Sequence, residues 1–191
     1  YKSLKTASEN EFSQLKMKFY LLDNSSDSAC PIEKGYLSDG ETRADLVINE
    51  KGQLLLPLDK KLKQDNAAIT IVTPQQNMCH LKMQIEVADF ELSHTGLSNV
   101  ISWSKQVDSL YERLAGWPGK YFMPDLEGLN FHLNDIEPKP VYFVSDKGRE
   151  LLKTNADNQV YISIKQLESF AKDGHFDFSG QLIKVTPQLA K

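Results

Sequence analysis

The sequence lacks a long apolar run, an excess of basic residues and a rich supply of cysteine. No stretch approaches the roughly 20 apolar residues that a helix needs to cross a bilayer, so we expect no membrane span. Acidic residues outnumber basic ones by 26 to 22, and the net charge of −4 argues against nucleic acid as a partner, because nucleic-acid binding usually requires a basic stripe. The hydrophobic fraction of 40% is ordinary for a globular protein with a real core.

Sequence signatures of catalysis are also scarce. The four histidines are spread along the chain without an i, i+4 pair, and no second Cys or His lies at ligand spacing beyond the adjacent Cys79 and His80. There is no GxSxG nucleophile elbow, and Gly116-x-x-Gly119 lacks the Lys-Ser/Thr of a phosphate-binding loop. We therefore predict no metal, no cofactor and no catalytic motif.

The two cysteines, Cys30 and Cys79, are predicted to form a disulfide, with isolated buried thiols as the alternative. Cys30 precedes Pro31 in a turn and Cys79 opens a strand, in segments that we expect to pack on one another. Such a bond would stabilise the fold by roughly 4 kcal/mol on the loop-entropy model, and it indicates an oxidising compartment. The chain begins at Tyr1 without an initiator Met, which we interpret as a removed signal peptide or a trimmed chain.

Part of the sequence occurs twice. The run from Asn49 to Leu54 is echoed by the run from Asn155 to Val160, and an apolar alternation follows each copy. Gly52 and Asn158 hold equivalent places, and both residue types tolerate the positive φ that tight turns demand. Both copies are followed by Val-Thr-Pro-Gln, at 72–75 and 185–188, whose proline should end a strand.

The echo predicts a duplicated supersecondary unit, with chance similarity of short β segments as the alternative. On the assumption that the two tetrapeptides are equivalent, the second copy carries seven extra residues around Gly174 and Gly180. The second copy also ends soon after Gln188, so a sheet made from it alone would have an open edge. We predict that residues 129–133, which alternate apolar and polar, supply the missing strand.

One stretch has the period of a helix. Apolar residues recur on one face of residues 99–115, and we expect this face to bury Trp103, Val107, Leu110 and Leu114. Ser98 or Asn99 is expected to cap the start of this helix, and Gly116 followed by Pro118 its end.

The remaining periodic stretches are short, alternate with period two and are separated by turn signals, which indicates strands. The predicted fold class is therefore α+β, mainly antiparallel β. We expect an N-terminal β unit resembling a sandwich at 1–95, a connecting amphipathic helix and aromatic loop at 96–127, and a smaller C-terminal β unit at 128–191 that is a partial repeat of the first.

The loop at 116–129 is the most unusual segment. Its aromatic residues Trp117, Tyr121 and Phe122, with Met123, are interpreted as a plug between the helix and the β units. If they are exposed instead, these aromatics with Asp125 and Glu127 form a recognition patch for a protein or a carbohydrate.

Four runs, taken together and in this order, resemble an uncharacterised family of exported gammaproteobacterial proteins known only as a domain of unknown function: CPIEKG at 30–35, LLLPLDKKLKQDNA at 54–67, the segment from VTPQ to Cys79, and FMPDLEGL at 122–129. The resemblance covers roughly residues 1–135. It implies export across the inner membrane and a periplasmic location, and it implies no activity.

Two functional hypotheses follow. The first is a non-enzymatic periplasmic protein that binds or scaffolds other components of the cell envelope, with an envelope protein or a glycan as partner. The second is a small hydrolase whose site lies near Asp125, Glu127 and His132, which requires a concave pocket that holds these groups together.

Overall fold

The computed structural model describes all residues except 1, 27, 39, 42, 57–67, 75–78, 89–93, 135–138 and 191. The chain divides into two compact units. The first unit comprises Tyr1–Lys5 and Met17–Gln84, and the second comprises Thr6–Lys16 and Ile85–Lys191. Most strand pairs are antiparallel, which confirms the predicted α+β, mainly antiparallel class. The three-part division at residues 95 and 127 stays a prediction about domains.

The first unit contains two sheets. The first sheet has the order β4-β5-β1-β7 and the second has the order β3-β2-β6. Their strands are β1 (Leu15–Asp23), β2 (Lys34–Ser38), β3 (Arg43–Asp45), β4 (Val47–Ile48), β5 (Gln53–Leu55), β6 (Ala68–Val72) and β7 (Cys79–Val87). The short helices α1 (Lys2–Ala7) and η1 (Asn10–Phe12) precede β1.

The core of the first unit is a small apolar cluster joined by the disulfide. Leu21, Leu37, Leu46 and Leu54 are buried around Cys30. Cys30 is bonded to Cys79, and their Cα atoms are 5.9 Å apart, so the predicted disulfide is confirmed.

The second unit also contains two sheets, with the orders β12-β9-β14 and β11-β10-β13-β8. Their strands are β8 (His94–Gly96), β9 (Leu126–Leu133), β10 (Val141–Ser145), β11 (Gly148–Leu152), β12 (Gln159–Ser163), β13 (His175–Phe178) and β14 (Leu182–Leu189). Strand β9 pairs with both β12 and β14, so the prediction that residues 129–133 complete the C-terminal sheet is confirmed. Phe131 of β9 stacks on Phe176 and Phe178 of β13, with ring centroids 5.8 and 5.7 Å apart, which joins the two sheets into one core.

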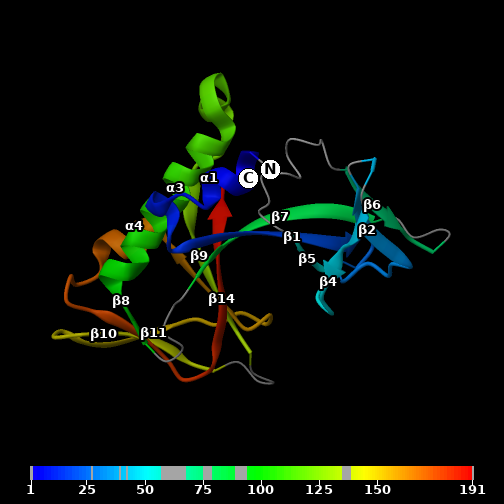
Figure 1. Cartoon of the computed structure of the whole chain (residues 1–191). Helices are drawn as coiled ribbons and strands as arrows, with labels where there is room; N and C mark the ends of the chain where they lie inside the picture. Colours follow the sequence, from blue (N-terminus) through cyan, green and yellow to red (C-terminus); the bar gives the residue numbers. More distant parts are fainter. Residues whose placement is uncertain are drawn as a thin grey trace. The chain divides into compact units, whose positions relative to one another are not determined.

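Helix α3 (Leu97–Gly119) packs against the strands of the second unit, and its C-terminal end projects beyond them (Figure 1). Trp103, Val107 and Leu110 are buried as predicted, whereas Leu114 is only half-buried. The helix begins earlier than expected, with Gly96 as its N-cap and no side-chain cap, because Leu97 is itself buried in the core. A second helix, α4 (Ile164–Ser169), follows β12 and carries a capping box between Ser163 and Gln166.

The two units repeat the same strand arrangement. The order β5-β1-β7 in the first unit corresponds to β12-β9-β14 in the second, and β3-β2-β6 corresponds to β11-β10-β13. The paired residues of the β2–β3 hairpin recur in the β10–β11 hairpin when 106 is added to each residue number, so that Tyr36 corresponds to Tyr142. Tyr36–Asp45, Leu37–Ala44 and Ser38–Arg43 recur as Tyr142–Leu151, Phe143–Glu150 and Val144–Arg149. This agreement favours duplication over chance similarity.

The echoed turns share their hydrogen bonds as well. Asn49 Oδ1 accepts from the amides two and four residues later, both at 3.0 Å, and Asn155 Oδ1 accepts from the equivalent amides at 3.0 and 2.9 Å. Gly52 and Asn158 both have positive φ, 76° and 56°, as their residue types predicted. The side-chain amide of each asparagine therefore builds the same turn in each unit.

The shared Val-Thr-Pro-Gln is not part of the repeat, which corrects the prediction. Val72 ends β6, whereas residues 185–188 lie inside β14, whose counterpart is β7. The seven extra residues inferred from this alignment are therefore wrong. Pro187 does not end its strand, because β14 pairs only with β9 among the described strands and an edge strand tolerates a missing N–H. Gln75 lies outside the described residues.

Candidate functional site

The end of α3 presents three aromatic side chains to solvent. The helix breaks where Gly116 adopts a φ of 63°, and the chain continues through Trp117 into the 3₁₀ helix η2 (Lys120–Phe122). Trp117, Tyr121 and Phe122 are 82%, 70% and 83% exposed, so the prediction that they plug a seam is wrong. The fully buried face of α3 ends at Leu110, and the residues beyond Gly116 extend past it. We call these three residues the aromatic tip.

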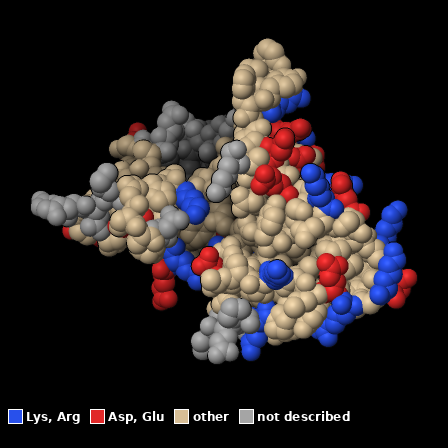
Figure 2. All heavy atoms as spheres, turned by 180° about the vertical axis from the view of Figure 1, so that it is seen from behind, with Lys and Arg blue, Asp and Glu red and all other residues tan. Residues whose placement is uncertain are grey.

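Below the aromatic tip, α3, α4 and the start of β9 enclose a pocket of about 490 Å³. Its wall is partly apolar and partly acidic. The lining residues are Ile101, Ser104, Lys105, Asp108, Asp125, Leu126, Ile164, Leu167 and Glu168. Figure 2 shows acidic side chains gathered under the projecting end of α3, whose surface is otherwise largely uncharged. The volume lies in the range of small-molecule and side-chain binding pockets.

The electrostatics of this pocket disfavour anions. Burial raises the pKa of Asp108 above its ordinary value, and the neighbouring Glu112 and Asp125 raise it further. Three carboxylates line the pocket and Lys105 is the one cationic group among its lining residues. A bound cation would relieve the repulsion among these carboxylates. The pocket is therefore suited to a positively charged group that carries an apolar stem.

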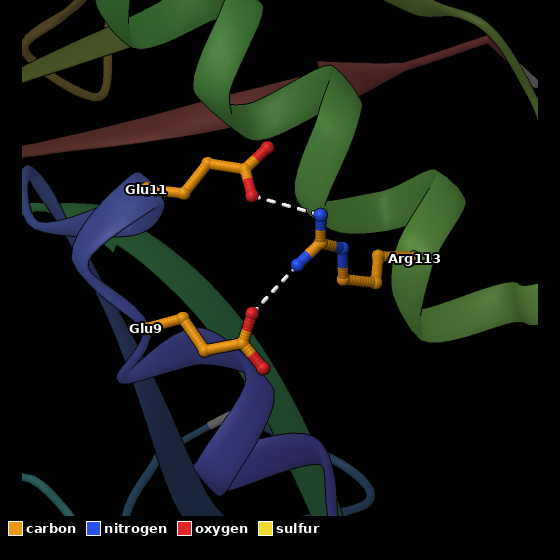
Figure 3. Close-up of polar contacts among 3 residues, drawn as sticks. All are labelled: Glu9, Glu11 and Arg113. Carbon is orange, nitrogen blue, oxygen red and sulfur yellow. Dashed lines mark hydrogen bonds and ion pairs between the residues drawn. The ribbon is translucent and has the colours of Figure 1, made fainter.

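The aromatic tip is held by contacts between α3 and the N-terminal segment of the second unit. Arg113 lies between Glu9 and Glu11, with nitrogen–oxygen distances of 2.6 and 2.8 Å (Figure 3). Phe12 is buried, and the Arg113 guanidinium lies 5.4 Å from its ring centroid. Two turns earlier on the same helix side, Gln106 Nε2 donates to Gln14 Oε1 at 2.6 Å. These contacts fix the part of α3 that precedes the aromatic tip against residues 9–14.

The structure brings Asp125 into this site but not the other two polar residues of the hydrolase hypothesis. Glu127 is exposed, and its backbone carbonyl accepts from the Tyr161 hydroxyl at 3.1 Å. His132 lies five residues further along β9, which at about 3.3 Å per residue is roughly 16 Å away and on the opposite face of the strand. These three side chains do not converge on one pocket.

His132 has a structural environment of its own. Its Nε2 is 2.9 Å from Thr186 Oγ1, and Thr186 is buried. The pKa of His132 is lowered from 6.5 to about 4, mainly by burial and also by the nearby charge of Lys184, while Glu86 acts in the opposite direction. The imidazole is therefore neutral at pH 7 and holds a hydrogen bond across the sheet.

Sequence reasoning missed Asp108, Ser104 and Glu168. One signal for Asp108 was present in the sequence. Asp108 and Glu112 form a like-charge pair at i, i+4, which destabilises an isolated helix, and such an unfavourable pair can mark a functional position. Glu168 carried no such signal, because its place in the pocket depends on the packing of α4 against α3.

Within the described residues, no group of three or more His, Cys, Asp or Glu side chains is arranged to hold a metal ion. Across the same residues, no helix is long and apolar enough to span a membrane.

Comparison with known protein families finds a match. A family described as "Protein of unknown function (DUF2987)" matches residues 1–133, a range that includes α3, the aromatic tip and β9. Comparison with curated proteins and with solved structures finds no match.

Proposed function

Because the chain belongs to the DUF2987 family of proteins of unknown function, its role has to be argued from its own surface, and we propose that it is a non-enzymatic binding module of the cell envelope. The observation that carries this proposal is the aromatic tip. Three large aromatic side chains, each at least 70% exposed, lie within six residues at the end of a braced helix. Exposed aromatic clusters of this kind are typical of binding surfaces.

The periplasm is the proposed location. The Cys30–Cys79 disulfide supports it, because such bonds persist in oxidising compartments. A fractionation experiment tests this directly: the protein is expected in the osmotic-shock fraction of the cells that make it. Recovery only with the cytoplasm would contradict the proposed location.

We favour a protein over a glycan as partner. The pocket beneath the aromatic tip combines an apolar wall with three carboxylates, and this combination suits a lysine or arginine side chain, whose aliphatic stem and charged end match the two parts of the wall. Neutral sugars would leave the carboxylates uncompensated. The aromatic tip would then supply apolar contact area beside the bound cation.

Site-specific photo-crosslinking tests the proposed surface. A benzophenone-bearing amino acid is introduced at Trp117, Tyr121 or Phe122 in the full chain, and the cells are irradiated. The matched control is Leu151 on β11, which is 59% exposed and also lies in the second unit. Adducts are expected from the aromatic tip and not from Leu151.

The nature of the adduct distinguishes the partners. Loss of the adduct on protease treatment identifies a protein, and loss on glycan digestion identifies a glycan and overturns our choice of partner. Equal adduct yields from Leu151 and the aromatic tip, or no adduct at either place, would refute the binding surface itself.

The pocket has a separate test that uses small probes. Acetyl-arginine amide is titrated into the isotope-labelled protein and compared with acetyl-citrulline amide, its uncharged analogue. Amide shifts around Asp108, Asp125 and Glu168 are expected with the arginine probe, and about tenfold weaker binding with citrulline, which corresponds to loss of one charge-assisted contact. Asp125→Asn should reduce the arginine affinity, and equal binding of both probes would contradict the proposed charge selection.

A further inference from the structure

The same arginine–tyrosine pair occurs in both units. In the first unit the Arg43 guanidinium lies 3.4 Å from the ring centroid of Tyr36, and in the second unit Arg149 lies 3.6 Å from that of Tyr142. Adding 106 to the first pair gives the second, so the pair belongs to the duplicated hairpin. Each tyrosine precedes a buried residue of its strand, so both pairs lie on the sheet face directed away from the core.

A carboxylate completes this pair in the second unit. Asp177 is the residue of β13 that pairs with Tyr142 across the sheet, and its Oδ2 accepts a hydrogen bond from Arg149 Nη2 at 2.9 Å. A guanidinium stacks through its planar face and donates through its edge, so it binds the tyrosine ring and the carboxylate at the same time. The second unit thus shows which group the edge of this arginine binds.

The first unit has smaller residues at the equivalent places. The residue of β6 that pairs with Tyr36 is Thr70, which stands where the second unit has Asp177. Two residues earlier on the same face of β6 is Ala68, where the second unit has His175. Both replacements shorten the side chain, and neither carries a charge. The space beside the arginine–tyrosine pair is therefore filled by the chain itself in the second unit and left open in the first.

The charges around Arg43 favour an incoming anion. Arg43 is exposed, and no carboxylate in the part of the chain that the structure describes forms an ion pair with it. This holds also for Asp45, which is opposite Tyr36 on the same sheet face. Lys34, two residues before Tyr36 on that face, is exposed and adds positive charge, whereas adding 106 to its number gives the uncharged Pro140 in the second copy.

From this comparison we propose that Arg43 and Tyr36 form a docking site for an aspartate or glutamate side chain of a partner protein. The incoming carboxylate takes the place that Asp177 occupies in the second unit, beside Thr70, and accepts hydrogen bonds from the edge of the Arg43 guanidinium. Stacking on Tyr36 orients the guanidinium for this contact. The occupant is a protein side chain because the group that fills the equivalent place is one. The site lies in the first unit, so it is independent of the aromatic tip.

The equivalent pair in the second unit serves as the internal reference for the test. Acetyl-glutamate amide is titrated into the full chain, isotope-labelled at arginine, and acetyl-glutamine amide is its uncharged control. The glutamate probe is expected to shift the Arg43 Nε–H resonance with a millimolar dissociation constant, because one exposed ion pair contributes little binding free energy. The Arg149 resonance should stay in place, since this arginine already holds its carboxylate.

Exchanging the two partner residues should exchange the behaviour of the two arginines. Thr70→Asp supplies an internal carboxylate, and it should weaken binding of the glutamate probe at Arg43 about threefold to fivefold, the effect of one exposed ion pair. Asp177→Thr removes the internal carboxylate, and it should make Arg149 respond to the probe. The backbone amide spectrum of each variant checks that the fold is kept.

Arg43→Gln is a second variant at an exposed position, and it should abolish the shifts that the glutamate probe causes in the backbone amides of Tyr36 and Thr70. Persistence of these shifts in Arg43→Gln, or equal shifts with the glutamine probe, would overturn the proposal. A response at Arg149 in the parent chain as large as that at Arg43 would also overturn it, because the internal carboxylate would then not decide which arginine is available. Tighter binding of inorganic phosphate than of the glutamate probe at the same ionic strength would overturn the choice of a carboxylate.

Discussion

Because His132 is neutral in the folded protein, we predict that the free energy of unfolding depends on pH. The folded protein holds the pKa of His132 at about 4, against 6.5 for an ordinary histidine, mainly because the ring is buried. At pH values between about 4 and 6.5, the imidazole of His132 is protonated in the unfolded chain and neutral in the folded chain. The free energy of unfolding must therefore rise with pH across this window and fall as the pH is lowered from 6.5 to 4.

The size of this effect follows from the shift in pKa. At about 1.4 kcal/mol for each unit, a shift from 6.5 to about 4 corresponds to roughly 3 kcal/mol. The ring of His132 is half-buried, so solvent screening reduces this value, and we expect about 2 kcal/mol. Burial also raises the pKa of Asp108, so the contribution of carboxylates to the acid side of the stability curve has to be separated from that of His132.

His132→Gln provides this separation, because glutamine is uncharged at every pH and retains a group that can reach Thr186. Urea unfolding of both proteins is measured from pH 7 to pH 4, and the difference between the two curves isolates the histidine. The parent protein should lose about 2 kcal/mol more than the variant over this range. Parallel curves, or an NMR titration that places the pKa of His132 near 6, would refute the reasoning.

The remaining predictions concern packing in the second unit, and thermal or urea unfolding checks both. Leu110→Ala should cost roughly 2–5 kcal/mol, because Leu110 is fully buried and its truncation leaves a cavity under α3, whereas a cost near zero would contradict the assigned core face. Gly128→Ala should cost several kcal/mol, because the new Cβ would collide with the carbonyl oxygen of Ile162 and lie 2.7 Å from Tyr161 Cε2; an unchanged unfolding midpoint would show that β12 and β9 are not packed this closely.

Much of the fold could be predicted from sequence because its causes are local. Alternation of apolar and polar residues marked β1, β7 and β9, and the period of 3.6 marked the buried face of α3 as far as Leu110. The echoed turns were recognisable because an asparagine and a residue tolerant of positive φ build the same hydrogen bonds wherever they occur. The Val-Thr-Pro-Gln repeat was misleading because strand pairing is not a local property. Four identical residues do not determine which strand they belong to or which strand they pair with.

The candidate site, in contrast, depends on contacts between distant segments. The sequence by itself determined the strands, the helix and the residues that the disulfide joins, since each of these depends on neighbours or on a single pair. Only the tertiary structure decided that Trp117 and Phe122 face solvent and that Asp108, Asp125 and Glu168 share one pocket. The physical reason is that exposure and electrostatic potential at a side chain are set by every segment packed around it, including those that no local pattern brings together.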